Sequence, residues 1–230
     1  VGRGVLGALA PDTSAFDAKD IRRSMPRFAA EHYPHNLALM AQQAQRMQTL
    51  VNDLLTLSRL EGSPVPGTAE NFDAAELLDA ALDEARSLSD VLAHGSHELV
   101  RVFGPALTLV GSRSEWHSAV SNLLSNAVRY TPAGGQVSAG WRLLPDGAAE
   151  LAISDTGPGI APEHLPRLTE RFYRVDRSRS RETGGTGLGL AIVKHVVQRH
   201  GGQLRIESRL GKGSVFTLVV PAQRVRVTAL

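Results

Sequence analysis

The sequence predicts a two-layer α+β domain that is preceded by a helical segment. Three amphipathic stretches have the spacing of helices, and six short apolar stretches have the length of strands. An apolar content of 42% over 230 residues is enough for a substantial core. Helices packed on a mixed, mostly antiparallel sheet are the arrangement that this order of elements favours.

A long helix is expected over residues 37–61, because apolar or small side chains recur there at alternating spacings of four and three. These positions are Met40, Ala44, Met47, Val51, Leu54 and Ser58. Leu50 and Leu57 widen the stripe on one side. We call the stripe the seam; it requires a partner helix, from this chain or from another one.

Upstream, residues 5–9 have the pattern of a helix end. Residues 11–34 are expected to be irregular, because Pro26 and Pro34 would interrupt a continuous helix. The expected organisation is a helical segment, a linker, the α+β domain and a tail, at residues 1–63, 64–70, 71–223 and 224–230.

Within the α+β domain, helices are expected at residues 74–87, 114–130 and 188–200. Strands are expected at residues 98–103, 106–110, 135–144, 149–154, 203–208 and 214–220. Ser114 is expected to cap the second helix, and Thr131 with Pro132 to end it. Gly201 and Gly202 are expected to end the third helix.

Composition excludes several classes of protein. The chain has no cysteine, which removes disulfides and thiolate metal sites, and its formal net charge is only +2. No stretch approaches the eighteen apolar residues of a membrane-spanning helix. The one dense basic run, residues 174–181, adjoins a glycine-rich stretch and lacks the interleaved aromatics of a nucleic-acid binder. The chain begins Val1-Gly2, so we expect it to be part of a longer protein.

Three motifs carry the candidate chemistry. Asn122 and Asn126 lie four residues apart on one helix face, and two amides with Arg129 suit a magnesium-phosphate group. An ordinary solvated helix face is the alternative. Asp155 ends a buried strand before Gly157 and Gly159, so it can accept a hydrogen bond from an amino group in a pocket; a plain turn is the alternative.

The third motif is the glycine-rich stretch over residues 184–190, which leads directly into a helix. Backbone N–H groups at such a helix start are suited to an anion. No Gly-Lys-Ser/Thr follows, so this is not a Walker loop. A flexible linker is the alternative reading.

The order of these motifs, with Phe172-Tyr173-Arg174 between the second and third and Gly-Lys-Gly-Ser after them, resembles the ATP-binding domain of bacterial sensor histidine kinases. These are the N, G1, F, G2 and G3 boxes of that family, and they span about residues 72–221. The resemblance implies a Bergerat-type (GHKL) two-layer sandwich that follows an antiparallel helical hairpin. Residues 53–61 resemble the second helix of the family's dimerisation domain, and residues 162–195 look most like the phosphate-regulon sensor kinase subfamily.

The resemblance implies ATP and Mg²⁺ as ligands. Asn126 would bind the metal, with Asn122, Arg129 and Arg174 as the catalytic residues that support the metal or contact phosphate. Backbone groups of the glycine-rich stretch would hold the phosphates, from Gly185, Thr186, Gly187, Leu188 and Gly189.

The remaining implied roles concern the adenosine and the lid. Asp155 would accept from the adenine amino group with help from Thr217. Gly157, Gly159, Ile160 and Tyr130 would shape or line that pocket. Phe172 and Tyr173 would fasten a lid formed by the arginine run.

The resemblance also implies a homodimer through the helical segment, a response-regulator receiver domain as partner, and no nucleic acid or direct membrane contact. It places the chain in the cytoplasmic portion of an inner-membrane sensor. The phosphoacceptor motif His-Glu-x-x-x-Pro is absent, and His32 and His35 are expected to precede the seam helix. We therefore expect ATP binding without self-phosphorylation.

Two other functions fit parts of the pattern. An ATPase clamp of the gyrase, Hsp90 or mismatch-repair type shares the fold, but it would need a glutamate as general base where Asn122 stands. Glu115 lies on the same face two turns away. A non-catalytic dimerisation or docking module is the second alternative, which the intact motifs argue against.

Overall fold

The computed structural model describes residues 18–92, 97–175 and 185–227. The chain divides into two units, Val1–Met47 and Gln48–Leu230, which are considered separately. In these described ranges, no helix combines the length and the apolar character that crossing a bilayer requires.

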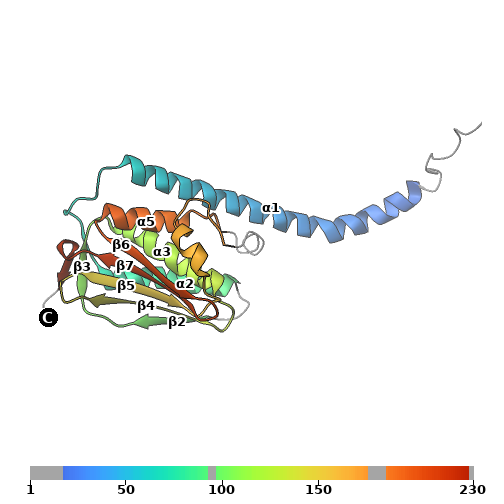
Figure 1. Ribbon diagram of the computed structural model, residues 1–230. Coiled ribbons are helices and arrows are strands. Elements are labelled where there is room, and N and C mark those ends of the chain that lie inside the picture. The colour runs from blue at the N-terminus through green and yellow to red at the C-terminus, as the bar shows by residue number, and fades with distance from the viewer. Residues whose placement is uncertain (1–17, 93–96, 176–184, 228–230) are drawn as a thin grey trace, which may run out of the picture. The chain divides into compact units, whose positions relative to one another are not determined.

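Helix α1 (Ala18–Gly62) is one continuous helix, so the prediction of an irregular segment before the seam is wrong from Ala18 onward. Pro26 and Pro34 lie inside it. An internal proline removes one backbone hydrogen bond, which bends a helix without always ending it. The ribbon of α1 curves in its N-terminal half (Figure 1). His32 and His35 therefore lie within the helix, and the expected helix end at residues 5–9 lies outside the described residues.

The larger sheet has five strands in the order β2-β4-β5-β7-β6. Their bounds are β2 Glu98–Val102, β4 Gln136–Leu143, β5 Ala149–Asp155, β6 Gln203–Arg209 and β7 Gly213–Val220. The β2–β4 pair is parallel and the other three pairs are antiparallel. The prediction of a mixed, mostly antiparallel sheet is confirmed.

A smaller antiparallel sheet joins β1 (Asn71–Asp73), β3 (Leu107–Val110) and β8 (Val225–Val227) in the order β1-β3-β8. The sequence did not predict β1 or β8, because three residues are too few to show an alternating pattern. The expected tail therefore contributes a strand. Two short 3₁₀ turns, η2 (Pro162–Arg167) and η3 (Ala222–Arg224), complete the described elements.

Three helices cover one face of the larger sheet: α2 (Ala74–Leu92), α3 (Arg113–Tyr130) and α5 (Gly189–Arg199) (Figure 1). Helix α3 is capped by Ser112 and not by Ser114, because the Ser112 hydroxyl accepts from the Glu115 N–H at 3.5 Å. Thr131 ends α3 as predicted, because its backbone is extended (φ −82°, ψ 129°) although its N–H still bonds to the Ala127 carbonyl.

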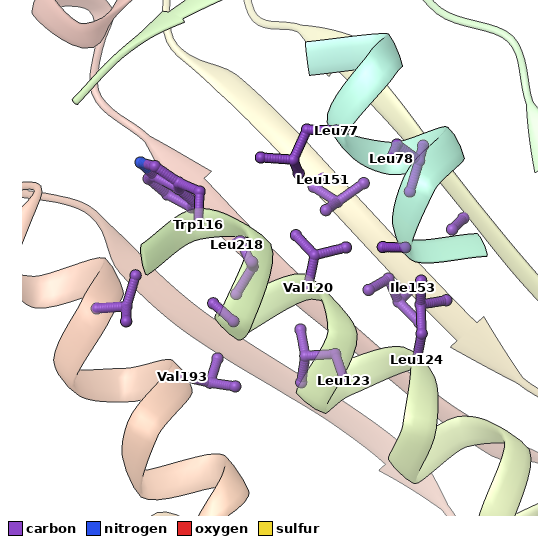
Figure 2. Close-up of a cluster of buried hydrophobic side chains, with 14 of the residues drawn as sticks. Leu77, Leu78, Trp116, Val120, Leu123, Leu124, Leu151, Ile153, Val193 and Leu218 are labelled. Carbon is purple, nitrogen blue, oxygen red and sulfur yellow. The ribbon is translucent and has the colours of Figure 1, made fainter. Parts of the chain in front are cut away.

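The core lies between the helices and the sheet. Figure 2 shows side chains of α2, α3, α5, β5 and β7 gathered in one cluster. Trp116 of α3 is fully buried there, and the Trp141 indole of β4 donates to the carbonyl of Ala74 at the start of α2, at 3.0 Å. Alternating residues of β5, such as Leu151 and Ile153, fill the sheet side of the core. This packing fixes α3, α5 and the end of β5 relative to one another.

The C-terminal part of α1, which belongs to the second unit, has two apolar faces. Leu57 and Leu60 are 4% exposed and join the core, and Leu50 packs against it. By contrast, the seam residues Val51 and Leu54 are 52% and 44% exposed. The stripe that the sequence treats as one seam therefore has one side covered by the domain and one side open.

Candidate functional site

Helix α3 presents the first motif beside the start of α5. The Asn122 amide nitrogen donates to the Ser118 carbonyl of its own helix at 2.8 Å. Its Oδ1 atom faces α5, because a Cβ built on Gly189 would lie only 2.6 Å from it. Asn126 lies one turn further along the same helix and is half-buried, as is Arg129. Glycine is thus required at residue 189 for α3 and α5 to approach.

The glycine-rich stretch is shaped by contacts on both sides. The Phe172 N–H donates to the Gly187 carbonyl at 2.9 Å, which joins the two ends of the segment around the expected lid. Gly187 has φ 77°, and a Cβ there would lie 2.9 Å from the Phe172 Cα. Leu188 is fully buried and provides no side-chain capping bond to α5. The Leu188 side chain therefore caps none of the first N–H groups of α5, and such groups suit an anion.

Asp155 ends β5, as predicted, and accepts from the Gly157 N–H at 2.8 Å. Burial raises the pKa of Asp155, and hydrogen bonds from the backbone of Gly157 and Ser214 partly offset this. A Cβ on Gly157 would lie 3.1 Å from the Tyr130 carbonyl oxygen at the end of α3. The aspartate turn and the asparagine helix therefore meet.

Tyr130 also faces the glycine-rich stretch. A Cβ built on Gly185 would lie 3.7 Å from the Tyr130 hydroxyl and 3.7 Å from a guanidinium nitrogen of Arg174. The structure thus brings together the paired amides, the strand-end aspartate and the glycine-fronted helix around one region. Residues 176–184, which contain most of the arginine run and Gly184, lie outside the described residues.

Thr217 is not part of this region, and the expectation that it assists Asp155 is wrong. Strand pairing sets Thr217 opposite Ala152 and Ser214 opposite Asp155. Because side chains alternate between the faces of a sheet, Thr217 lies on the face opposite to that of Asp155. Ser214 is paired with Asp155 instead, and its backbone hydrogen-bonds to the Asp155 carboxylate. Knowing how β5 pairs with β7 would have pointed to Ser214.

The remaining predicted residues frame the site. Ile160 packs against the core, and its N–H donates to the Ser208 hydroxyl at 2.8 Å. Phe172 has φ 63° and is 58% exposed, which is an uncommon conformation for a bulky residue. The Tyr173 hydroxyl lies 2.7 Å from Nδ1 of His164. Gly159 approaches Arg209 so closely that a Cβ would lie 2.0 Å from its carbonyl oxygen.

The sequence reading missed a contact between α1 and the glycine-rich stretch. The Thr186 hydroxyl donates to Oδ2 of Asp53 at 2.5 Å. Asp53 lies between Leu50 and Leu57 on the face of α1 that packs against the domain. Asp53 interrupts an apolar stripe with a charged side chain, and this was the feature of the sequence that could have indicated a contact there.

Glu115 is not free to act as a general base. Both of its carboxylate oxygens accept from Arg199 at 3.1 Å, and the two side chains are 18% and 9% exposed. Position 122 carries an amide, so the described residues of the site offer no carboxylate where an ATPase clamp needs one.

The region fits a magnesium-bound polyphosphate. Gly185, Gly187 and Gly189 lead into an eleven-residue helix, and the backbone N–H groups at the start of a helix suit an anion. Within the described ranges there is no cluster of three or more His, Asp or Glu side chains that could hold a metal. Amide oxygens of Asn122 and Asn126 are the hard ligands that remain, and Mg²⁺ accepts such ligands together with phosphate oxygens.

Comparison with known proteins adds independent support. Residues 111–224 match the family model described as "Histidine kinase-, DNA gyrase B-, and HSP90-like ATPase". The phosphate regulon sensor protein PhoR of Pseudomonas aeruginosa is 50% identical over 188 residues, which cover 81% of this chain and 42% of the relative. The sensor-like histidine kinase SenX3 of Mycobacterium tuberculosis is 39% identical over 223 residues, 96% of this chain and 50% of the relative.

A solved structure of the mycobacterial sensor histidine kinase MprB is 33% identical, with a TM-score of 0.59. The match covers 69% of this chain and 99% of that chain. The chain thus spans about half the length of the curated relatives it matches, and it covers 99% of one solved relative.

Proposed function

The chain belongs to the sensor histidine kinase family, and on this premise we propose that it is the ATP-binding catalytic core of a two-component signalling kinase. The observation that carries the proposal is the convergence at one place of Asn122 on α3, Asp155 on β5 and the glycine-fronted start of α5. The reaction is transfer of the γ-phosphoryl group of ATP to a histidine nitrogen, with ADP as the leaving product.

Different residues bind different parts of Mg·ATP in this proposal. Asp155 accepts a hydrogen bond from the adenine amino group, next to Gly157. Asn126 and Asn122 offer amide oxygens to Mg²⁺, and the metal supplies charge neutralisation for the phosphates when bound. Arg129 and Arg174 add positive charge at the same region, and phosphoryl transfer requires little beyond such positioning and neutralisation.

The backbone holds the phosphates in this proposal. Gly185, Gly187 and Gly189 contribute N–H groups, and the macrodipole of α5 adds attraction for an anion. Phe172 anchors one end of the lid through its bond to Gly187.

At the level of the whole protein, we propose a homodimer that forms through α1 and a response-regulator receiver domain as phosphoryl acceptor. The exposed seam residues Val51 and Leu54 support the dimer, because exposed leucine and valine at heptad spacing need a partner helix. Similarity to the phosphate regulon sensor protein PhoR supports a part in phosphate sensing, and we propose that the chain is the cytoplasmic portion of an inner-membrane sensor.

Isothermal titration calorimetry with Mg·ATP tests the binding step. We expect Asn126→Ala to remove the magnesium dependence of binding, whereas Ser125→Ala, a neighbour on the same helix, retains it. For the transfer step, a histidine-bearing dimerisation domain of a relative is added with γ-labelled ATP. Acid-labile phosphate on that domain is the expected result. Absence of magnesium-dependent ATP binding would refute the proposal, and steady ATP hydrolysis without a phosphoprotein would favour an ATPase clamp.

A further inference from the structure

A side-chain hydrogen bond between described residues fastens the glycine-rich stretch to α1. The Thr186 hydroxyl donates to Oδ2 of Asp53 at 2.5 Å, although the two residues are 133 positions apart in the sequence. Asp53 is half-buried on the face of α1 that packs against the core through Leu57 and Leu60. We call this contact the loop latch.

The latch also determines the hydrogen-bonding role of the Thr186 hydroxyl oxygen. A hydroxyl group has one proton, and here that proton is given to Asp53. The oxygen is left to accept, and it accepts from the Leu188 N–H at 3.2 Å. Two hydrogen-bond donors of the glycine-rich stretch, the Thr186 hydroxyl and the Leu188 N–H, are therefore satisfied within the protein.

Both donors lie where a phosphate group would need them. Backbone N–H groups at the start of a helix bind anions, and Leu188 directly precedes α5. Burial raises the pKa of Asp53, and the bond from Thr186 partly offsets this, so the carboxylate is held at a cost in desolvation.

The end of α1 is fastened separately from the latch. Glu61 pairs with Arg171, and Arg199 donates to the carbonyls of Leu60, Ser63 and Pro64. These contacts hold the base of the helix to the domain, whereas Asp53 lies about two turns before them. The latch is therefore a contact separate from those that hold the base of α1 to the domain.

We propose that Asp53 is a positioning residue that acts through Thr186, holding the glycine-rich stretch in an arrangement that binds nucleotide phosphates weakly. Release of α1 from the stretch then frees both donors and raises the affinity for ATP. The inference rests on the proposed ATP-binding function and adds to it a means by which the dimerisation helix controls that site.

Calorimetry with Mg·ATP and with adenosine separates the effect on phosphates from the effect on the base pocket. We expect Asp53→Ala to bind Mg·ATP about fivefold more tightly, the equivalent of one hydrogen bond gained. Asp53→Asn keeps a weaker, neutral acceptor and should fall between Asp53→Ala and the wild type. Adenosine has no phosphate, so its affinity should not change.

Two further variants identify the route. The double variant Asn52→Asp with Asp53→Asn restores the charge of the helix on an exposed neighbouring position, and it should behave like Asp53→Asn alone. In a Thr186→Val background, Asp53→Ala should add no further gain, because the residue that transmits its effect is absent. Thermal unfolding of each variant reports whether the fold is intact.

The proposal is overturned if Asp53→Ala leaves ATP affinity unchanged or lowers it, or if ATP and adenosine change equally. It is also overturned if the gain persists in the Thr186→Val background. If neither the wild type nor any variant binds Mg·ATP, the proposed function itself fails together with the latch. If the wild type binds Mg·ATP but Asp53→Ala has the same affinity, the latch is refuted and the proposed function stands.

Discussion

His200 and Ser112 join the end of α5 to the start of α3, because Nε2 of His200 accepts from the Ser112 backbone N–H at 3.2 Å. The other ring nitrogen, Nδ1, lies 2.8 Å from the Val196 carbonyl oxygen, which can only accept. Nδ1 must therefore carry the proton, and the imidazole is neutral. The side chain is 1% exposed, so the folded state depends on this one protonation state.

We expect acid to weaken the fold through His200. Burial lowers the pKa of His200 below its ordinary value of 6.5, so the unfolded chain takes up the proton first. Stability is complete above pH 6.5 and falls as the pH drops toward the lower folded pKa, by at most about 1.4 kcal/mol per pH unit. Urea denaturation between pH 8 and pH 5 measures this. His200→Gln should flatten the slope, with His195→Gln as the control for loss of a histidine from α5. An unchanged slope in His200→Gln contradicts the assignment.

Asp155→Asn should separate binding from stability. Burial raises the pKa of Asp155 above its ordinary value of 3.8, so ionising the carboxylate costs folding free energy at any pH above 3.8. Asparagine removes the charge and can still accept from the Gly157 N–H. We expect the free energy of unfolding to stay equal or rise, while ATP affinity falls roughly tenfold or more with loss of a charge-assisted bond to adenine. Denaturation and calorimetry check the two effects. Loss of both together would mean that Asp155 is structural.

Two glycines in the same stretch should differ in their tolerance of alanine. A Cβ on Gly189 would lie 2.6 Å from Oδ1 of Asn122, whereas a Cβ on Gly185 would meet nothing closer than 3.7 Å. We expect Gly189→Ala to cost about 1–3 kcal/mol by overpacking. Gly185→Ala should change stability by less than about 0.5 kcal/mol. Equal effects in chemical denaturation would show that α3 and α5 adjust to the added methyl group.

The fold was predictable where local patterns agree with tertiary packing. Leu151 and Ile153 alternate with the exposed Ala152, so β5 reads directly as a strand with one buried face. The rule against internal prolines failed at α1, because a proline costs one hydrogen bond and a long helix has many others. Two serines near the start of α3 are equivalent in the sequence, and only backbone geometry selects Ser112.

The site was predictable from motif order, but contacts between strands and distant segments were not. The sequence pointed to Thr217, and preferring Ser214 requires the register of β7 against β5, which no single strand reveals. The bond between Asp53 and Thr186 joins positions far apart in the chain, and no periodic pattern connects them. Roles that depend on such pairings therefore need the structure.

The open side of α1 should mediate dimerisation. Val51 is 52% exposed on the seam, whereas Asn52 is exposed beside it. We expect Val51→Glu to shift the protein from dimer to monomer in sedimentation velocity runs, because charge on a seam opposes helix pairing. Asn52→Glu adds the same charge off the seam and should leave the dimer intact. A dimer that survives Val51→Glu places the interface elsewhere.

Arg199 should hold the segment between α1 and the domain in place. Its guanidinium donates to both oxygens of Glu115 and to carbonyls at the end of α1, including that of Ser63 at 2.9 Å. The Arg199 side chain is 9% exposed, so Arg199→Ala leaves Glu115 largely buried without its cation. Loss of one partner of such a pair costs about 3–5 kcal/mol when burial is complete, and we expect about 2–4 kcal/mol here.

Limited proteolysis adds a local readout to the unfolding measurement. Release of the carbonyls of Ser63 and Pro64 should speed cleavage between residues 62 and 67 in Arg199→Ala. Arg199→Lys keeps the charge but cannot bond to Glu115 and the carbonyls together, so it should give an intermediate rate. Arg205→Ala provides the matched control, because Arg205 pairs with Glu150 on the sheet. If cleavage in Arg199→Ala is no faster than in Arg205→Ala, the segment is held by the apolar contacts of Leu57 and Leu60 instead.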